Sequence, residues 1–386
     1  MNSECPDSGG LYIHIAYCRR KCIYCDFFSA GERVADWHRY VDALIAELTH
    51  RKNELPCPLL TVYVGGGTPS LMPAEEFQRL ADALRPYSGS VTEFTIEVNP
   101  DDVCEEKLMV WKDAGVNRLS IGIQTFDDTL LKTIGRRHDG EVARRALKLA
   151  RQYFDNLSVD LMYGLPGQTT DIFKKDLEET MKIRPEHISA YSLMFEPGTA
   201  LTLLRDKGKV QEVDDRMAEE MYLMLVRELT RMGYEHYEIS NFALPGRRSR
   251  HNSSYWRQKP YLGIGPSAHS YDGERTRKAN RADLRGYLDC MAPLSVGSDL
   301  SIEDITDREY LSDEELREEY LLTRLRTREG VDLLDFKRRF GEPEYRRLLS
   351  RADRWIKDGS VTIDETHLAL TENSILISDS IIIDLA

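Results

Sequence analysis

The chain has 386 residues, of which 41% are hydrophobic and 30% are charged, and its formal net charge at pH 7 is −13. Nowhere does an apolar run approach the roughly 18 residues that a membrane-spanning helix needs, so we expect no integral membrane segment. Because nucleic acids are polyanions and this chain is acidic, we also expect no nucleic acid among its partners.

The first two thirds of the chain alternate short apolar runs with amphipathic helical patterns, which indicates βα units on a parallel sheet. The run from Val41 to Leu48 has apolar residues at i, i+3, i+4 and i+7, so its helix presents one apolar stripe to a sheet. Six such units predict an α/β fold with a full or partial βα barrel; an open doubly wound sheet is the alternative. The expected strands span residues 11–16, 61–64, 94–98, 118–123, 158–163 and 187–194.

The βα pattern ends after a helix that carries Met217, Met221 and Met224. Methionines at this spacing are more typical of a core-facing stripe than of a cofactor contact. Residues 234–300 are rich in aromatic and turn residues, which predicts additional strands and loops that extend the barrel.

Residues 301–386 have the pattern of three helices and a small hairpin, which predicts a winged-helix-like module. Ser312 and Glu315 form a capping box at the start of its first helix. The module contains 13 basic and 21 acidic residues, a net charge of −8, so packing or protein contact is favoured over DNA binding. We therefore predict three domains: the barrel over 1–233, the extending strands over 234–300 and the module over 301–386.

The seven cysteines are distributed unevenly, with three of them inside eight residues and four scattered. A disulfide framework is typical of an even, spread set in a small secreted chain. The first dozen residues also lack the basic and apolar regions of a signal peptide. Together these features predict a cytoplasmic protein with one metal site.

Cys18, Cys22 and Cys25 form a C-x3-C-x2-C motif at the end of the first expected strand. Structural zinc sites need four ligands, usually two cysteine pairs or a cysteine pair with a histidine pair. Iron–sulfur clusters also use cysteine thiolates. Three thiolates would leave one iron of a [4Fe–4S] cluster open to a small molecule, and the spacing favours this cluster over zinc.

Polar or glycine residues follow several of the other expected strands. Gly65–Gly67 and Thr68 come after the second strand, where glycines let the backbone approach a ligand closely. Glu97 and Gln124 end the next two strands, and Asp160 lies in the fifth. Because the carboxyl ends of barrel strands meet at one mouth, where such barrels have their active sites, we expect these residues to share a site.

These motifs resemble those of the radical S-adenosylmethionine (SAM) superfamily, whose cysteine motif follows the first barrel strand. The resemblance implies a partial (βα)6 TIM-like barrel and a [4Fe–4S] cluster whose open iron binds the amino and carboxylate groups of SAM. An electron donor then allows SAM to be cleaved into methionine and a 5′-deoxyadenosyl radical. By motif position, the resemblance implies cluster ligands Cys18, Cys22 and Cys25, and SAM contacts Tyr12, Tyr24, Gly66, Gly67, Thr68, Glu97, Gln124, Arg136 and Asp160.

Within this superfamily, motifs along nearly the whole chain resemble the coproporphyrinogen dehydrogenase-like branch and, best of all, its heme chaperones, the HemW family. They include YIHIAYCRRKCIYCDF, YVGGGTPS, VDLMYGLPGQT, RHNSSYW and YLGIGPSAHS. The related coproporphyrinogen III oxidase has a fourth cysteine where this chain has Phe27, and a sizeable arm before the cluster, whereas 17 residues precede Cys18 here. Both differences favour the chaperone. Ala16 replaces a proline that most relatives have, which removes no ligand.

The run RHNSSYW resembles the H-N-x-x-Y-W motif associated with heme in the chaperones. It implies that His251 is an axial ligand of heme iron, with Tyr255 and Trp256 available to pack on the porphyrin. His14 and His269 are weaker candidates, because strand and glycine-loop contexts explain them without a ligand.

The resemblance therefore implies a heme chaperone that binds heme and a SAM-ligated cluster and passes heme to an acceptor protein. Two enzymatic alternatives stay open. One is an oxygen-independent coproporphyrinogen III oxidase, and the other is a different radical SAM enzyme that acts on a porphyrin or heme.

Overall fold

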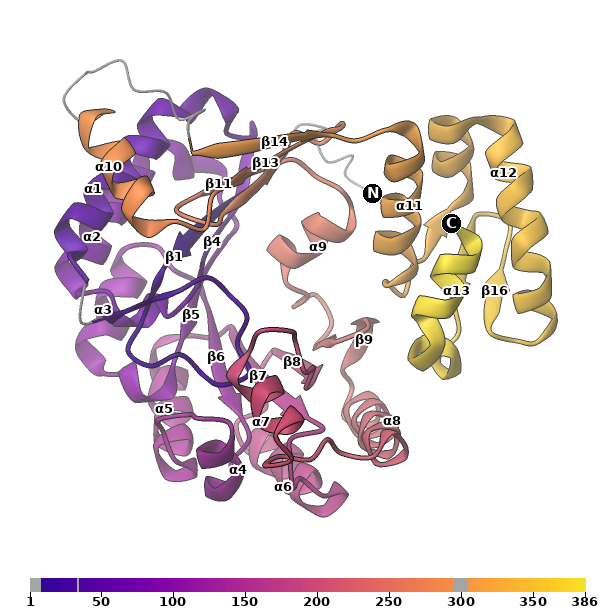
Figure 1. Ribbon diagram of the computed structural model, residues 1–386, viewed down its shortest axis with the longest axis horizontal. Helices are drawn as coiled ribbons and strands as arrows, with labels where there is room; N and C mark the ends of the chain where they lie inside the picture. The colour runs from indigo at the N-terminus through magenta and orange to yellow at the C-terminus, as the bar shows by residue number, and fades with distance from the viewer. Residues whose placement is uncertain (1–7, 33–34, 295–304) are drawn as a thin grey trace.

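The computed structural model describes residues 8–32, 35–294 and 305–386. Its central feature is a twelve-stranded sheet, in which six neighbouring parallel strands follow one another in chain order (Figure 1). Because parallel crossovers are right-handed and the order never reverses, the connecting helices lie on one face of the sheet. This is a partial (βα)6 TIM-like barrel, and it excludes the doubly wound sheet, whose strand order reverses. The six predicted strands are confirmed as β1 (Gly9–Ile15), β4 (Leu59–Gly66), β5 (Glu93–Val98), β6 (Arg118–Gln124), β7 (Leu157–Tyr163) and β8 (His187–Ser192).

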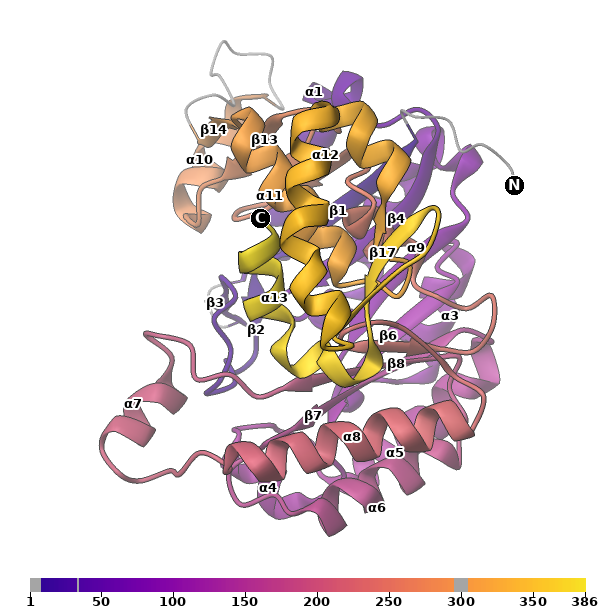
Figure 2. The ribbon, with the colours of Figure 1, turned by 90° about the vertical axis from the view of Figure 1, so that its right-hand side faces the viewer.

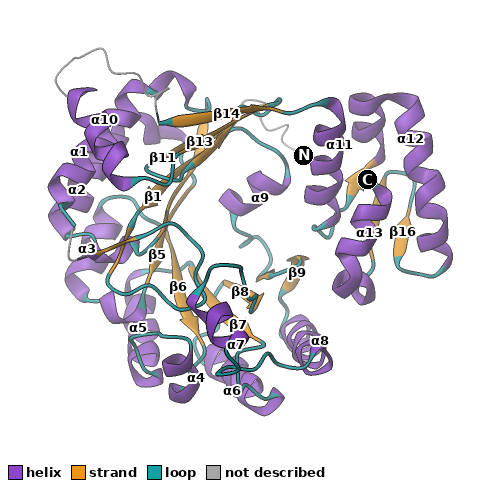
Figure 3. Ribbon diagram, in the orientation of Figure 1, coloured by secondary structure: helices purple, strands orange, loops and turns teal. Residues whose placement is uncertain are grey.

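Helices cover the outer face of these six strands (Figure 3). Several of them begin at good capping residues, since Asp36, Asp139 and Thr169 each accept a hydrogen bond from a backbone N–H of the first turn. The sheet and most of these helices share one hydrophobic core, in which Met221 is fully buried. Met217 and Met224 pack against this core, whereas Leu130 and Leu201 belong to a separate, smaller cluster. The predicted core role of that stripe is confirmed. The helices are α1 (Trp37–His50), α2 (Ala74–Leu84), α3 (Glu105–Asp113), α4 (Asp128–Thr133), α5 (Gly140–Tyr153), α6 (Thr170–Met181), α7 (Ala200–Asp206) and α8 (Asp215–Arg231).

Additional strands extend both edges of the barrel, as predicted. On one side, β10 (Asn241–Ala243) pairs antiparallel with β8 and is followed by β9 (Glu235–Glu238). On the other side, β11 (Tyr261–Ile264) pairs in parallel with β1 and is followed by β12 (His269–Tyr271) and β13 (Thr276–Asn280). A further strand, β14 (Thr306–Tyr310), pairs with β13 although it lies in the range expected for the C-terminal module.

Two helices in this region were not expected from the sequence. The RHNSSYW segment forms the short helix α9 (Arg250–Trp256), where the side chain of Ser249 accepts a hydrogen bond from the N–H of Asn252. The other is α10 (Leu284–Leu294), which contacts α1.

The C-terminal module has a hydrophobic core of its own. Its elements are α11 (Asp313–Leu325), β15 (Val331–Asp332), α12 (Leu333–Lys357), β16 (Val361–Ile363), β17 (His367–Leu370) and α13 (Ser378–Leu385). The predicted capping box of Ser312 and Glu315 begins α11. A break at Gly341, with φ of 88°, divides α12 into the two helices expected from the sequence. The hairpin of β16 and β17 is confirmed, whereas α13 was not predicted.

The module lies against the barrel extension, as Figures 1 and 2 show from two sides. The Arg326 guanidinium lies 5.6 Å from the ring centroid of Trp256 in α9. Arg248, which follows β10, forms an ion pair with Glu329 of the module. None of the helices in the described parts of the chain is long and apolar enough to cross a membrane.

Candidate functional site

A pocket of about 400 Å³ opens at the carboxyl ends of the barrel strands. It brings together every residue predicted to hold the cluster or SAM except Tyr12. His251 does not line it, although the next residue, Asn252, does. The predicted residues in its lining are Cys18, Cys22, Tyr24, Cys25, Gly66, Gly67, Thr68, Glu97, Gln124, Arg136 and Asp160.

The three cysteines lie on one loop that follows β1. A short parallel pairing of β2 (Tyr17–Cys18) with β3 (Ala30–Gly31) closes this loop, and the N–H of Cys25 donates to the carbonyl of Cys22 at 3.2 Å. All three thiols are free. Among the residues that the structure describes, no three His, Cys, Asp or Glu side chains gather tightly enough to hold a single metal ion. Three free thiols that share one pocket are the right donors for an iron–sulfur cluster.

Hydrogen-bond donors lie beside two of the sulfurs. The hydroxyl of Thr68 donates to Sγ of Cys18 at 3.4 Å, and the guanidinium of Arg136 lies 3.7 Å from Sγ of Cys22. The thiolate is the form of cysteine that binds metal. Burial raises the pKa of Cys25 to about 11, so this thiol needs a bound metal to become a thiolate at neutral pH.

The glycine loop packs directly on the cysteine loop. Gly66 has φ of 111°, which favours glycine. A Cβ on Gly67 would lie 2.7 Å from the carbonyl oxygen of Tyr17 and 3.0 Å from Sγ of Cys18. Only glycine therefore lets the chain after β4 pass this close to Cys18 and its loop.

Glu97 faces the pocket from the end of β5. Its two oxygens accept hydrogen bonds from the hydroxyl of Tyr63 at 2.8 Å and from the N–H of Gly66 at 3.1 Å. Burial, together with the nearby Asp160 carboxylate, raises the pKa of Glu97 to about 7. Tyr12 lies behind Tyr63, on whose ring its own ring stacks with 6.2 Å between centroids. It contacts a residue of the pocket rather than the open space.

Three further polar side chains line the pocket. Asp160 accepts hydrogen bonds from the hydroxyl of Ser120 at 3.2 Å, and burial raises the pKa of its carboxyl. Gln124 has φ of 68° at an irregular end of β6, a conformation that is strained for a residue with a side chain. The guanidinium of Arg136 donates to Oδ1 of Asn99 at 2.8 Å.

Sequence reasoning missed Arg118, which also lines the pocket. This side chain begins β6 and the residue is only 1% exposed. Its Nε has no hydrogen-bond partner in the described part of the chain. The one available signal was a charged residue at the start of a short predicted strand, RLSIGIQ.

His251 lies inside the barrel rather than at the mouth. Its Nδ1 is 2.8 Å from the hydroxyl of Thr61, its Nε2 is 2.8 Å from the hydroxyl of Tyr255, and its ring stacks on Tyr63. Burial, and then the charge of Arg118, lowers the pKa of His251 to about 3, so the ring is neutral. In this arrangement both ring nitrogens are occupied by hydroxyl groups, which leaves none directed at an external iron.

Comparisons with known proteins agree with this geometry. Residues 12–180 match the sequence profile of the Radical SAM superfamily, and residues 311–377 match that of the HemN C-terminal domain. The fold is shared with coproporphyrinogen III oxidase (HemN) from Escherichia coli, with a TM-score of 0.81 and 22% identity over 99% of this chain and 91% of that one. Fold and motifs together define a radical SAM protein, a class that implies SAM and a [4Fe–4S] cluster.

Similar proteins of known name identify the family within this class. Heme chaperone HemW from Bacillus subtilis is 36% identical over 96% of this chain and 97% of its own length. Heme chaperone HemW from Lactococcus lactis is 35% identical over 85% of this chain and 84% of its own length, and that from Escherichia coli is 36% identical over 72% and 75%. The chain belongs to the HemW family, and the resemblance predicted from its motifs is confirmed.

Proposed function

We propose that this protein is a cytoplasmic heme chaperone that binds heme and a SAM-ligated [4Fe–4S] cluster and passes heme to an acceptor protein. The observation that carries the proposal is the match to heme chaperones named HemW along nearly the full length of both chains. Phe27 supports it, since this residue stands where the oxidase has its fourth cysteine.

The residues at the mouth fit the cofactors that the class implies. In the proposal, Cys18, Cys22 and Cys25 hold three irons of the cluster, which supplies an electron and one open iron for SAM. The backbone of the glycine loop contacts the SAM amino group, and Arg136 binds its carboxylate as a fork. Four other predicted contacts line the same pocket and surround the rest of the SAM molecule, while Glu97 accepts from its ribose hydroxyls: Tyr24, Thr68, Gln124 and Asp160. Tyr12 acts only through Tyr63, on which its ring stacks.

Exposed apolar side chains near the mouth suit a flat porphyrin. Phe27 is 64% exposed and Tyr191 is 42% exposed, and both line the pocket. Met194, which follows β8, is 62% exposed. Large apolar side chains that cluster at an opening mark ligand or partner surfaces. We propose that the porphyrin face packs on these side chains.

His251 is the proposed axial ligand, and ligation requires its ring to give up a hydrogen bond. Because Nε2 is held by Tyr255 and Nδ1 by Thr61, breaking one of these two contacts is the necessary step. Tyr255→Phe removes the hydroxyl that holds Nε2 of His251 and keeps the imidazole. It is therefore the matched control variant for His251→Ala.

The test is an anaerobic titration of the reconstituted protein with heme, followed by absorbance and by the mass of any adduct. We expect stoichiometric heme uptake without a porphyrin product. His251→Ala should shift or abolish the Soret band, whereas Tyr255→Phe should retain it, with cluster absorbance unchanged in both. An unchanged Soret band in His251→Ala would assign the iron ligand to another residue.

One observation favours a second candidate function, that of an oxygen-independent coproporphyrinogen III oxidase. The structural match to such an oxidase covers 99% of this chain. Anaerobic incubation with coproporphyrinogen III, SAM and a reductant separates the two functions. Formation of a decarboxylated porphyrinogen would establish the oxidase and overturn the chaperone proposal. A new product formed from heme itself would instead indicate another radical SAM enzyme.

A further inference from the structure

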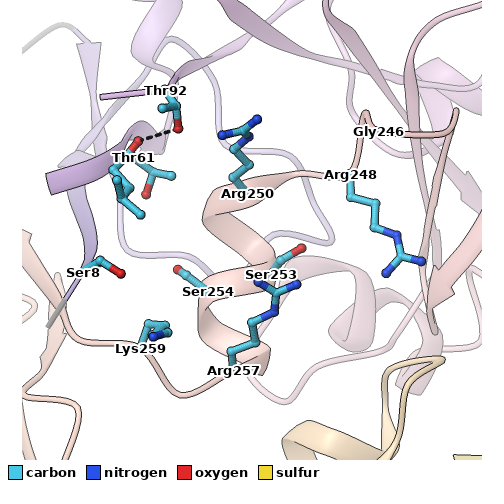
Figure 4. A pocket seen from close by; sticks show the side chains of 12 residues that line it. Ser8, Thr61, Thr92, Gly246, Arg248, Arg250, Ser253, Ser254, Arg257 and Lys259 are labelled. Atoms are coloured by element: carbon cyan, nitrogen blue, oxygen red, sulfur yellow. Dashed lines mark hydrogen bonds between the residues drawn. The ribbon is translucent and has the colours of Figure 1, made fainter. Parts of the chain in front are cut away.

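A second cavity, of roughly 350 Å³, lies at the opposite ends of the barrel strands (Figure 4). It is bordered by Gly9 at the start of β1, by Thr61 near the start of β4 and by Thr92 just before β5. Ligand pockets in proteins typically measure about 300 to 1,000 Å³, so this space suits a small molecule. It contains none of the residues proposed to hold the cluster, SAM or heme.

Helix α9 separates this cavity from the barrel interior. One face of the helix carries His251 and Tyr255, which bond to each other inside the barrel. The other face lines the cavity, with residues spaced at i, i+3, i+4 and i+7 as one helical face requires. This second face consists of Arg250, Ser253, Ser254 and, directly after the helix, Arg257. Figure 4 shows these four along one helical segment, opposite Ser8, Thr61 and Thr92.

The cavity is basic, because four cationic side chains from three segments line it. Arg248 reaches in from the loop after β10, Arg250 and Arg257 from α9, and Lys259 from the segment before β11. Two glutamates hold Arg248. The side chains of Arg250 and Lys259 have no hydrogen bond or ion pair with any residue that the structure describes. At least these two charges remain available to a ligand.

The hydroxyl groups of the same face are already used as donors. Ser253 donates to the carbonyl of Ser249 and Ser254 to that of His251, each at 2.6 Å. Glu93 beneath the helix accepts the backbone N–H groups of its first two residues at 2.9 Å. The cations therefore supply the free donors of the cavity, and the ligand must be an acceptor-rich anion.

We propose that this cavity binds a small phosphate-bearing ligand, with Arg250 and Lys259 as its main contacts. The Arg250 guanidinium and the Lys259 ammonium approach from two different segments, which matches a tetrahedral anion, whose oxygens point in several directions, better than a planar carboxylate. The site is distinct from the cluster pocket, and its ligand is neither SAM nor heme.

Inorganic pyrophosphate is the probe, with citrate as the carboxylate comparison, in calorimetric titrations of the cluster-loaded full chain at low ionic strength. We expect pyrophosphate to bind at one site per chain and citrate more weakly. The double variant Arg250→Ala, Lys259→Ala removes two charged contacts and should weaken pyrophosphate binding by about tenfold or more. Lys148→Ala with Arg216→Ala, two exposed cations on α5 and α8, is the matched control and should not change binding.

Three results would overturn the proposal: no pyrophosphate binding to the parent, equal binding by the cavity variant, or citrate binding as tight as pyrophosphate. Melting temperature and cluster absorbance verify that each variant is folded. If the double alanine variant does not fold, Arg250→Gln with Lys259→Gln removes the two charges and keeps most of the side-chain length. Heme uptake, measured separately, distinguishes a failure of this site from a failure of the chaperone function.

Discussion

Strand β5 carries a glutamate near each end, and the two are held in opposite ways. Glu93, at the amino end, is buried and accepts the backbone N–H groups of the first two residues of α9, both at 2.9 Å. Glu97, at the carboxyl end, accepts from Tyr63 and Gly66 and lines the mouth pocket. Glu93 therefore anchors the start of α9, whereas Glu97 lines the pocket that contains the three motif cysteines.

Both residues are glutamates on one strand, so their positions along the strand, and not their residue type, decide whether the carboxylate stabilises a neighbouring helix or lines the mouth pocket. At the carboxyl ends the loops are open, so polar groups such as Glu97 and Asp160 face a pocket. At the amino ends, Glu93 is enclosed by an added helix and stabilises the fold. The basic cavity lies at this same edge, where Arg250 and Lys259 line open space as the mouth residues do.

The sharpest test of the comparison removes a thiol at the mouth. Cys18→Ala, Cys22→Ala or Cys25→Ala should each abolish the broad charge-transfer absorbance of the reconstituted protein, because in the proposed cluster each thiolate holds one iron. Cys57→Ala is the control from the other edge, since Cys57 is exposed and precedes β4. Loss of absorbance in the control alone would place the cluster elsewhere.

The next largest effect is expected from Glu97→Gln. At pH 8 the Glu97 carboxylate is ionised, so the variant replaces a charged acceptor for the proposed ribose contact by a neutral amide. SAM affinity, measured by equilibrium dialysis at this pH, should fall by about tenfold, while iron content is unchanged. Glu93→Gln on the same strand should leave SAM affinity as it is. If both variants bind SAM like the parent, the contact assigned to Glu97 is wrong.

Glu93→Gln should act on stability instead. Glutamine has one acceptor oxygen for two backbone N–H groups, so one buried donor loses its partner, at a cost of about 1–3 kcal/mol in the free energy of unfolding. Urea unfolding measures this loss. A variant as stable as the parent would show that Glu93 does not hold α9.

A pH dependence of stability that belongs to Glu97 is also expected. Burial raises its pKa from 4.5 to about 7, so between these pH values the folded chain retains a proton that the unfolded chain has lost. The contribution of this proton to stability is fully present below pH 4.5 and is lost as the pH rises through 7. In protein without SAM, Glu97→Gln should flatten this fall, measured by urea unfolding from pH 5 to 8. Identical slopes would contradict the raised pKa.

Much of the mouth was predictable from the sequence, because its signals are local. Apolar runs locate the strands, strand order follows chain order, and a polar residue at a strand end must then lie at the mouth. Cys18, Gly67 and Glu97 each follow this rule. The C-x3-C-x2-C spacing needed no tertiary information at all.

The residues that sequence reasoning missed or placed differently depend on long-range contacts. Arg118 looks like an ordinary strand residue until the barrel closes around it. His251 carries a motif but no periodic signal, since α9 has only seven residues. Its position inside the barrel comes from Thr61, which is 190 residues away in the chain.

The sequence by itself determined the barrel, the cysteine motif and the set of polar strand ends, because hydrophobic periodicity and motif spacing are properties of neighbouring residues. Only the tertiary structure decided which way α9 faces, that both nitrogens of His251 are engaged, and that Arg248 and Lys259 meet Arg250 around one cavity. The physical reason is that a short helix has two faces of similar polarity, so its orientation is set by the partners that the fold brings to each side.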